Sequence, residues 1–408
     1  MRRNRPRGGG ALPHLVLILL LTGSAWSAST FKVLHNFNCT ANDGCGLYVP
    51  LTFDQKGTLY GATDAGGTYR GGTVFKLSPS ARGSWREKLL HSLNYHTEGA
   101  YIRGHLVLDG GGAVYGATTA GGPQSAGTVF ELTPGLGGWT FNILYGSFGS
   151  YGGLVMDGAG DLYGFLGAGT FHEGAVGELI PGSGGWTYNA LYSFGSQQGD
   201  GNTNYDGLTW DATGNLYGTN AYGGDPSCSW GCGTIFQLSP GSGGWQETVL
   251  HRFSGKDGQH PHAGVIFDRV GNLYTAASDG GGKNGSDYGN VFKLTPGSGG
   301  QWRGTVLHRF QNPYDGAAPV STPVMDSAGN IYGTAGGGDH YCNGGCGVVY
   351  KLTPRAKGPW KYTILHTFHW SDGAYTDGGV ILDSKGRLYG TTIEGGAYGG
   401  GVVYEITP

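Results

Sequence analysis

The sequence is poor in the residues that build long helices and highly charged surfaces. Of its 408 residues, 13% are charged and three are methionine. These shortages argue against a coiled coil or a long-helix protein. The 85 glycines follow no three-residue period, which excludes a collagen helix. Aromatic residues make up 12% of the chain and occur along its whole length, so the chain is not disordered throughout.

The familiar catalytic motifs are also missing. The sequence contains no G-x-S-x-G, no H-E-x-x-H and no P-loop motif. Its G-x-G stretches are turn-rich and precede no helix, so a dinucleotide site is excluded. The sequence therefore predicts an architecture better than it predicts a reaction.

The N-terminal segment has the composition of a secretory signal. Four arginines precede a short apolar run from Ala11 to Leu21, and small residues at Ala25 and Ser27 fit a cleavage after Ser27. The apolar run is shorter than the ~20 residues that span a bilayer, although an uncleaved N-terminal anchor is the alternative. We therefore expect residues 1–27 to be a signal peptide. The remaining residues, 28–408, are then exported to the periplasm or the extracellular space, with no membrane span.

Removal of the signal makes the chain acidic. It leaves 21 basic and 28 acidic residues, a net charge near −7. Nucleic acids and anionic membranes are bound by basic patches, so we expect neither as a partner. We expect the mature protein to be a monomer.

The six cysteines form three local pairs in glycine-rich stretches. The pairs are Cys39 with Cys45, Cys228 with Cys232, and Cys342 with Cys346. In an oxidising compartment such pairs predict short-range disulfides. A thiolate metal site is the alternative, but it would require two pairs to meet in space and the spacings are unusual for it.

One phrase recurs seven times: an apolar run, Asp, a short turn with Gly, then a hydrophobic residue and Tyr. The repeated aspartates are Asp54, Asp109, Asp157, Asp211, Asp268, Asp326 and Asp383. They are spaced by 48 to 58 residues, with a mean near 55. A fixed period of this size is typical of a propeller or a solenoid.

Each unit contains four short strand-like runs, such as GVIFD, NLYTA and NVFKL, followed by a run of the ETVLHRF type. Seven units of four strands predict an all-β, seven-bladed β-propeller in a single domain, residues 28–408. The chain begins after the signal with FKVLHNF, a fourth strand without its blade, and stops at Pro408 after a third strand. Pairing of these two terminal strands would complete the seventh blade and remove the open sheet edge.

The repeated stretches LYG(T/A)T, GTVFxLTP and GGWxxxxLHxF, between Phe31 and Pro408, resemble the GloVer (Gloeo_Verruco) tandem repeat of exported bacterial proteins. The resemblance implies an exported repeat protein and implies no established chemistry. Blade 3 departs most from the pattern, since it is the shortest and has Gly177 where the others have Phe or Tyr. Blade 5 has Thr275 in place of the glycine after Tyr274.

Residues present in every blade are interpreted as scaffold. The Asp-x-x-Gly phrases fit tight turns in which Asp caps backbone amides and Gly takes positive φ. The repeated Tyr and Trp residues fit packing between blades. The outer strands carry a histidine that tyrosine replaces twice, which fits packing and hydrogen bonding: His35, His91, His251, His308 and His366, with Tyr145 and Tyr192.

A second repeated acid follows the outer strand in six of the seven units. Its members are Asp43, Glu98, Asp200, Asp257, Asp315 and Asp372. They fit a turn of the Asx type. The alternative is a ring of carboxylates near the channel mouth that could hold Ca²⁺. We expect no other cofactor.

The connections divide into two sets. Two sets of loops are long and differ between blades: those between the second and third strands, and those from an outer strand to the next inner strand. Both sets must lie on one face, here called the variable-loop face. Sites concentrate in such loops on rigid scaffolds. We expect Arg103, His105, His260, His262 and Asp377 to approach the central channel, as catalytic candidates. Tyr205, Asp206, Trp370 and Tyr375 are the ligand-binding candidates.

Two functions fit this face. The first is an exported binding or scaffold protein that recognises a polysaccharide or another cell-surface ligand, because aromatic faces cover sugar C–H surfaces and polar groups hold hydroxyls. The alternative is a secreted carbohydrate-active enzyme, a lyase or hydrolase, with a His/Tyr/Arg or carboxylate site at the channel mouth. His and Asp ligands around a metal, as in a lactonase, are a further variant. Binding tolerates similar loops in several blades, whereas catalysis needs one convergent set of unlike residues.

Overall fold

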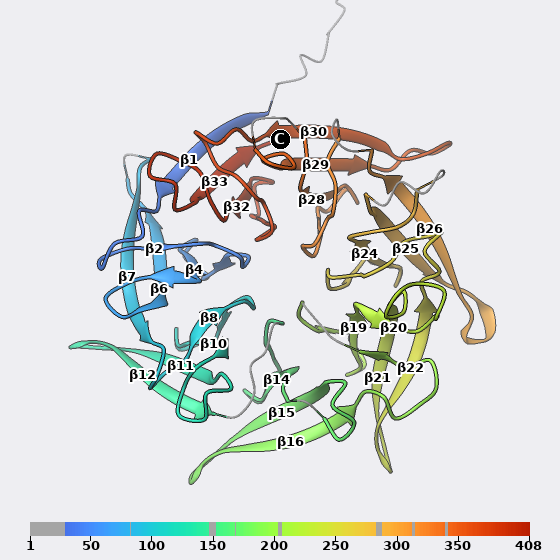
Figure 1. The fold of residues 1–408 in the computed structure, drawn as a ribbon, viewed down its shortest axis with the longest axis horizontal. Coiled ribbons are helices and arrows are strands. Elements are labelled where there is room, and N and C mark those ends of the chain that lie inside the picture. The colour runs from blue at the N-terminus through green and yellow to red at the C-terminus, as the bar shows by residue number, and fades with distance from the viewer. Residues whose placement is uncertain are drawn as a thin grey trace, which may run out of the picture.

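The computed structural model describes residues 29–408, except 82, 147–151, 168, 203–205, 283–287, 312–314 and 339–341. The predicted signal peptide, 1–27, lies outside the described residues. Seven antiparallel sheets stand in a ring around one axis (Figure 1). The protein is a seven-bladed β-propeller, as the repeat predicted. The described residues contain no α-helix, only a 3₁₀ turn, η1 (Ser298–Gly300).

The first four blades follow the chain around the ring. From inner to outer strand, blade 1 comprises β3 (Thr52–Phe53), β4 (Leu59–Thr63), β6 (Arg70–Pro79) and β7 (Trp85–Asn94). Blade 2 comprises β9 (Val107–Leu108), β10 (Val114–Ala120), β11 (Val129–Gly135) and β12 (Gly138–Tyr145), with β8 (Ala100–Ile102) paired to the end of β10. Blade 3 comprises β13 (Val155–Met156), β14 (Leu162–Phe165), β15 (Ala175–Gly182) and β16 (Gly185–Ser193). Blade 4 comprises β18 (Thr209–Trp210), β19 (Leu216–Asn220), β21 (Thr234–Gly241) and β22 (Gly244–Arg252).

The last three blades complete the ring. Blade 5 comprises β23 (Ile266–Phe267), β24 (Leu273–Ala277), β25 (Asn290–Pro296) and β26 (Trp302–Arg309). Blade 6 comprises β27 (Val324–Met325), β28 (Ile331–Ala335), β29 (Val348–Thr353) and β30 (Lys361–Thr367). Blade 7 comprises β31 (Val380–Leu382), β32 (Leu388–Thr391), β33 (Val402–Thr407) and β1 (Thr30–Asn36).

The two ends of the chain close the ring. In Figure 1 the blue strand β1 lies beside the red strand β33. The two strands are antiparallel, with Thr30 opposite Thr407 and Asn36 opposite Val402. The predicted terminal pairing is confirmed, and it satisfies the backbone groups that an open blade 7 would leave at its edge.

Hydrogen bonds confirm the scaffold interpretation of the Asp-x-x-Gly phrase. In blade 4, Asp211 Oδ1 accepts from the amides of Thr213 and Asn215 at 2.8 and 2.9 Å. The Tyr217 hydroxyl donates to Asp211 Oδ2 at 3.1 Å. In all seven turns the glycine takes a φ between 80° and 93°. These groups cap the turn between the first two strands, so they are occupied by the scaffold.

The outer-strand histidines hold neighbouring blades together. His308 Nε2 lies 3.1 Å from Asp315 Oδ2 in its own loop. Its ring stacks on Tyr362 of the next blade, with the ring centroids 3.9 Å apart. His366 stacks in the same way on Phe31, with the ring centroids 3.8 Å apart, across the seam between blades 6 and 7. The predicted hydrogen-bonding role is confirmed for four of the five histidines: His91, His251, His308 and His366. His35 Nε2 lies 3.6 Å from Asp43 Oδ1, beyond hydrogen-bond distance.

At two seams between blades, a glutamate occupies the outer-strand position from which an aromatic ring stacks elsewhere. Glu87 meets His35 and Asp43 between blades 7 and 1, and Glu247 meets Tyr192 and Asp200 between blades 3 and 4. The Tyr192 hydroxyl lies 3.1 Å from Asp200 Oδ2 and 3.2 Å from Glu247 Oε2. Burial, reinforced by Asp200, raises the pKa of Glu247 to about 8. Burial likewise raises the pKa of Glu87 to about 7.

These two carboxyl groups make stability depend on pH. The folded-state pKa of Glu247 lies above its ordinary value of 4.5, so its favourable contribution is complete below about pH 4.5 and is lost as the pH rises towards 8. We expect Glu247→Gln to raise the unfolding free energy at pH 8 by about 1–2 kcal/mol, well below the full shift because the side chain is partly solvated. At pH 4.5 the variant and the wild type should be nearly equal. Urea unfolding at the two pH values measures the difference.

The exposed Glu173 provides the matched control, since Glu173→Gln removes a carboxylate outside the seam. Its effect on unfolding should be small and independent of pH. A Glu247→Gln effect of equal size at both pH values would contradict the assignment of a protonated carboxyl to this seam.

Candidate functional site

The variable loops of the described residues are tied together on one face. The loop that enters a blade pairs with the loop between the second and third strands of that blade. In blade 1, β2 (Gly44–Cys45) pairs with β5 (Ala65–Gly66). In blade 4, β17 (Gly201–Asn202) pairs with β20 (Tyr222–Gly223). Single bridges do the same in blades 5, 6 and 7: Gln259 with Asp279, Ala317 with Gly336, and Ala374 with Glu394. The prediction that both loop sets share a face is confirmed.

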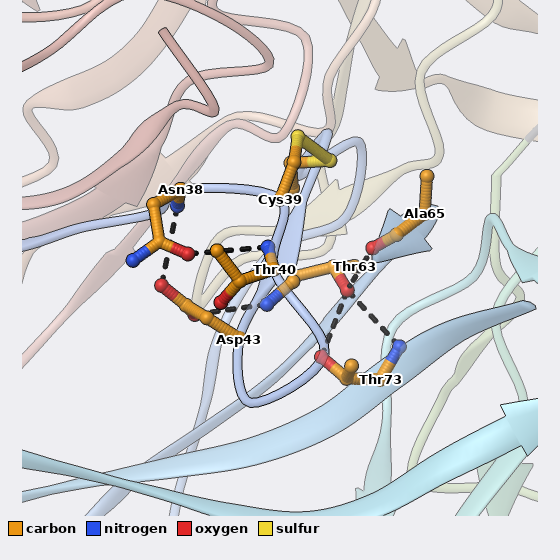
Figure 2. Close-up of a disulfide and its surroundings, with 9 residues drawn as sticks. Asn38, Cys39, Thr40, Asp43, Thr63, Ala65 and Thr73 are labelled. Atoms are coloured by element: carbon orange, nitrogen blue, oxygen red, sulfur yellow. Dashed lines mark hydrogen bonds between the residues drawn. A yellow bond between two sulfur atoms is a disulfide. The ribbon is translucent and has the colours of Figure 1, made fainter. Parts of the chain in front are cut away.

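All three predicted disulfides are present, and all lie in these loops. They join Cys39 to Cys45, Cys228 to Cys232, and Cys342 to Cys346, which leaves no free cysteine and makes the thiolate-metal alternative wrong. Figure 2 shows the first bridge beside the hydrogen bonds of its loop, where the Asn38 amide donates to Asp43 Oδ2 at 3.2 Å. The covalent and hydrogen-bonded ties fix loops that have little core of their own.

The second disulfide presents a tryptophan that the sequence reasoning missed. Trp230 lies inside the short loop closed by Cys228 and Cys232, and 85% of its surface is exposed. Its carbonyl accepts a hydrogen bond from the Gly223 amide at 2.8 Å, so the loop backbone is anchored. The available signal was that Trp230 falls outside the register of the six repeated tryptophans.

A cavity of about 320 Å³ lies at the mouth of the central channel, and we call it the mouth cavity. Its lining residues are Tyr48, Pro50, Arg103, Asp206, His262, Val320, Ser321 and Asp377. Five of these, Tyr48, Arg103, His262, Val320 and Asp377, occupy one register, three residues before the first core residue of an inner strand. A repeated backbone position therefore presents unlike side chains to one space.

Arg103 is held on the cavity wall by two partners. Its Nε and Nη2 each lie 3.1 Å from a carboxylate oxygen of Asp64. Its guanidinium carbon lies 3.7 Å from the centroid of the Tyr48 ring, a cation–π contact. Burial raises the pKa of Asp64, and the Arg103 charge opposes that shift. The pairing fixes Arg103 and offsets its charge.

Asp377 faces the same cavity without such a partner. Its side chain is open to the channel solvent yet closely surrounded by protein, and this desolvation raises the pKa of its carboxyl, against the influence of Arg103. Among the described residues, none donates a hydrogen bond to its carboxylate. The pKa of His262 shifts in the other direction. Burial lowers this pKa to about 4, which leaves the imidazole neutral at pH 7.

Asp206 lines the cavity and also links three blades. It accepts hydrogen bonds from the Gly207 amide at 2.7 Å, from the Gly264 amide at 3.1 Å and from the Thr322 hydroxyl. The predicted ligand-binding residue is thus also a crosslink of blades 4, 5 and 6.

His105 packs within the ring of inner-strand starts. Burial lowers its pKa, while Asp206 and a hydrogen bond to the Leu154 backbone oppose the shift. A Cβ at Gly153 would overlap its imidazole, and one at Gly207 would lie 2.6 Å from its Cε1. The two glycines therefore make the room that this one large side chain fills.

The remaining candidates lie apart from the mouth cavity. His260 is held by Asp279, with Nδ1 3.1 Å from Oδ2, and it does not line the cavity. Tyr375 packs partly buried against the core between blades 6 and 7, and Trp370 is exposed on the loop after β30. Tyr205 lies outside the described residues. Sequence reasoning missed Tyr48, Pro50, Val320 and Ser321, although Tyr48 and Val320 share the register of Arg103.

The second repeated acids do not form a ring at the channel mouth. Each is engaged in its own loop, as when Asp257 contacts His251 Nε2 at 3.0 Å and the Ser254 amide at 2.9 Å. Within the described residues, no group of three or more His, Cys, Asp or Glu side chains could hold a metal ion. The turn interpretation of these acids is confirmed.

Comparison with known proteins identifies the family. The sequence pattern described as the Gloeobacter/Verrucomicrobia repeat matches residues 24–230 and 210–408. The chain belongs to this repeat family. No curated protein matches it.

Three solved structures are similar to this family member at low sequence identity. PorZ, a surface component of the type-IX secretion system of Porphyromonas gingivalis, is 14% identical over 89% of this chain and 47% of its own, with a TM-score of 0.51. A putative oxidoreductase (glucose dehydrogenase) from Thermus thermophilus is 16% identical over 93% and 100% of the two chains, with a TM-score of 0.48. A luciferin-regenerating enzyme is 13% identical over 75% and 91%, with a TM-score of 0.46. The likeness to PorZ shows a shared fold alone.

In the part of the repeat protein that the structure describes, no helix has the length and apolar character needed to cross a membrane.

The fit between His105 and the neighbouring glycines can be tested by a double-mutant cycle. Gly153→Ala should lower the unfolding free energy by about 1–3 kcal/mol, because the added methyl overlaps the imidazole. Gly153 has no positive φ, so backbone strain adds nothing. In a His105→Ala background the same change should cost much less. Equal costs in both backgrounds, measured by denaturant unfolding, would show that the two positions do not interact.

Proposed function

We propose that this protein is an exported carbohydrate-binding propeller that recognises a cell-surface or secreted polysaccharide on its variable-loop face. One observation carries the proposal: eight aromatic side chains among the described residues are exposed, and every one lies in the loops of that face. They are Tyr69, Tyr95, Tyr101, Phe171, Trp230, Tyr288, Trp370 and Tyr398. On the opposite face of the propeller, the large side chains exposed in the turns are aliphatic: Leu136 and Val270.

Aromatic rings fixed on a rigid face suit sugars. A ring offers a flat apolar surface to sugar C–H groups and loses little conformational entropy on binding. Tyr95 and Tyr101 lie near each other, with ring centroids 6.2 Å apart, and Tyr101 is two residues from Arg103 on the cavity wall. The platforms and the mouth cavity can therefore contact one extended ligand. The predicted export and the three disulfides are consistent with a ligand outside the cell.

One observation also favours a second candidate, a carbohydrate-active enzyme. The mouth cavity gathers Arg103, His262 and Asp377 from three different blades. A neutral imidazole in the same cavity as a carboxyl of raised pKa is a combination used in acid–base catalysis. Binding remains the first proposal, because the exposed aromatic side chains are spread over seven variable loops, more than a single catalytic centre needs.

The proposal is tested by screening the mature chain against immobilised polysaccharides and a glycan array. Replacing Trp230 and Trp370 together with alanine should weaken binding of the preferred polysaccharide about tenfold or more, because both are exposed platforms. The matched control is Leu136→Ala, which removes an exposed side chain from the opposite face.

Equal binding by the double variant and the control would contradict the proposal. Release of reducing ends or unsaturated products in the same reactions, abolished by His262→Ala, would replace it with the enzyme candidate.

A further inference from the structure

The charges of the ionisable groups around the mouth cavity do not cancel. The positive charge of Arg103 is matched by Asp64, which contacts two of its nitrogens at 3.1 Å. Asp206 accepts three hydrogen bonds from the surrounding blades. His262 is neutral at pH 7. Asp377 differs from both aspartates because, among the described residues, its carboxyl group has neither an ion-pair partner nor a hydrogen-bond donor.

Asp377 can obtain little help from its surroundings. The positive charge of Arg103 acts on it, but that guanidinium already holds Asp64 and lies against the Tyr48 ring. Val320 and Pro50 supply apolar walls to the same cavity. Channel solvent reaches the Asp377 carboxylate, but the surrounding protein raises its pKa and no described group neutralises its charge, so a cationic ligand would gain a full ion pair there.

We propose that the mouth cavity binds an ammonium group, presented by an amino sugar of the polysaccharide, and that Asp377 is the residue that selects it. This inference rests on the proposed carbohydrate-binding function and adds the ligand class. The Asp377 carboxylate accepts a charge-assisted hydrogen bond from the ammonium, which is stronger than a bond from a neutral donor.

Other sugar groups fit this site less well. A hydroxyl would donate a hydrogen bond and leave the negative charge uncompensated. A carboxylate or phosphate would face both Asp377 and Asp206, while the guanidinium on the described cavity wall is engaged by Asp64. The volume, about 320 Å³, is at the small end of ligand pockets, roughly 300–1,000 Å³, and fits a single sugar residue.

The experiment compares three monosaccharide probes that differ at one substituent: D-glucosamine, D-glucose and D-glucuronate. Binding is followed by NMR of the Val320 methyl groups, which line the cavity, during millimolar titrations at about pH 6. We expect glucosamine to bind at least about tenfold more tightly than either of the other probes. Equal or tighter binding of glucose or glucuronate overturns the inference, and so does the absence of any glucosamine-induced shift.

Asp377→Asn should remove the preference by weakening glucosamine about tenfold while leaving glucose unchanged. The variant should fold, because the carboxyl it replaces has a raised pKa and does not stabilise the fold when ionised. Thermal unfolding checks this, and the wild-type probe series remains decisive if the variant fails. Glu394→Gln is the matched control, since it removes an exposed carboxylate from the same blade and face. A loss of preference in this control would contradict the role of Asp377.

Failure of this inference is distinguishable from failure of the proposed function. If glucosamine shows no preference but polysaccharide binding still depends on Trp230 and Trp370, only the ammonium site is wrong. If polysaccharide binding does not depend on those tryptophans, the proposed function itself is wrong.

Discussion

Seven inner strands converge on one axis, and the limited room there determines what the rest of the molecule can do. The residues at the start of these strands are mostly small, including Gly153, Gly207 and Gly264, because a Cβ there would meet a neighbouring blade. One large side chain, His105, fills the space that two of the glycines leave. The residues just before these positions, including Tyr48, Arg103 and His262, line the mouth cavity and have large side chains. The convergence of the inner strands thus brings single residues of distant blades together.

The outer part of the ring follows a different rule. There, repeated residues carry out repeated tasks: aspartates cap turns, histidines contact loop acids, and aromatic rings stack across seams. The two seams that contain Glu87 and Glu247 depart from this rule and place a second carboxyl beside an acid. These seams therefore contribute a pH-dependent term to the stability of the ring, while the proposed ligand contacts lie in the variable loops.

Much of this architecture could be predicted from the sequence, because a repeat states the same structural requirement seven times. The phrases around Asp211 and Tyr217 predicted the turn and the packing residue, and the terminal strands predicted the closure of the ring.

The site was harder to predict. Arg103, His262 and Asp377 were expected near the channel from their position before inner strands, and the structure places them around one cavity. His260, only two residues from His262, turns to Asp279 instead, a choice made by tertiary contacts that a sequence does not reveal. Trp230 was overlooked because a disulfide loop, not a repeated register, exposes it.

The central claim is that the ligand occupies the variable-loop face of the propeller. Amide hydrogen exchange of the protein saturated with its preferred polysaccharide tests this claim most directly. The account predicts slower exchange in segments 94–103, 222–233 and 368–378, which carry the aromatic platforms and reach the cavity wall. Protection confined to the short turns around Asp54, Asp109 and Asp211 on the opposite face would contradict it.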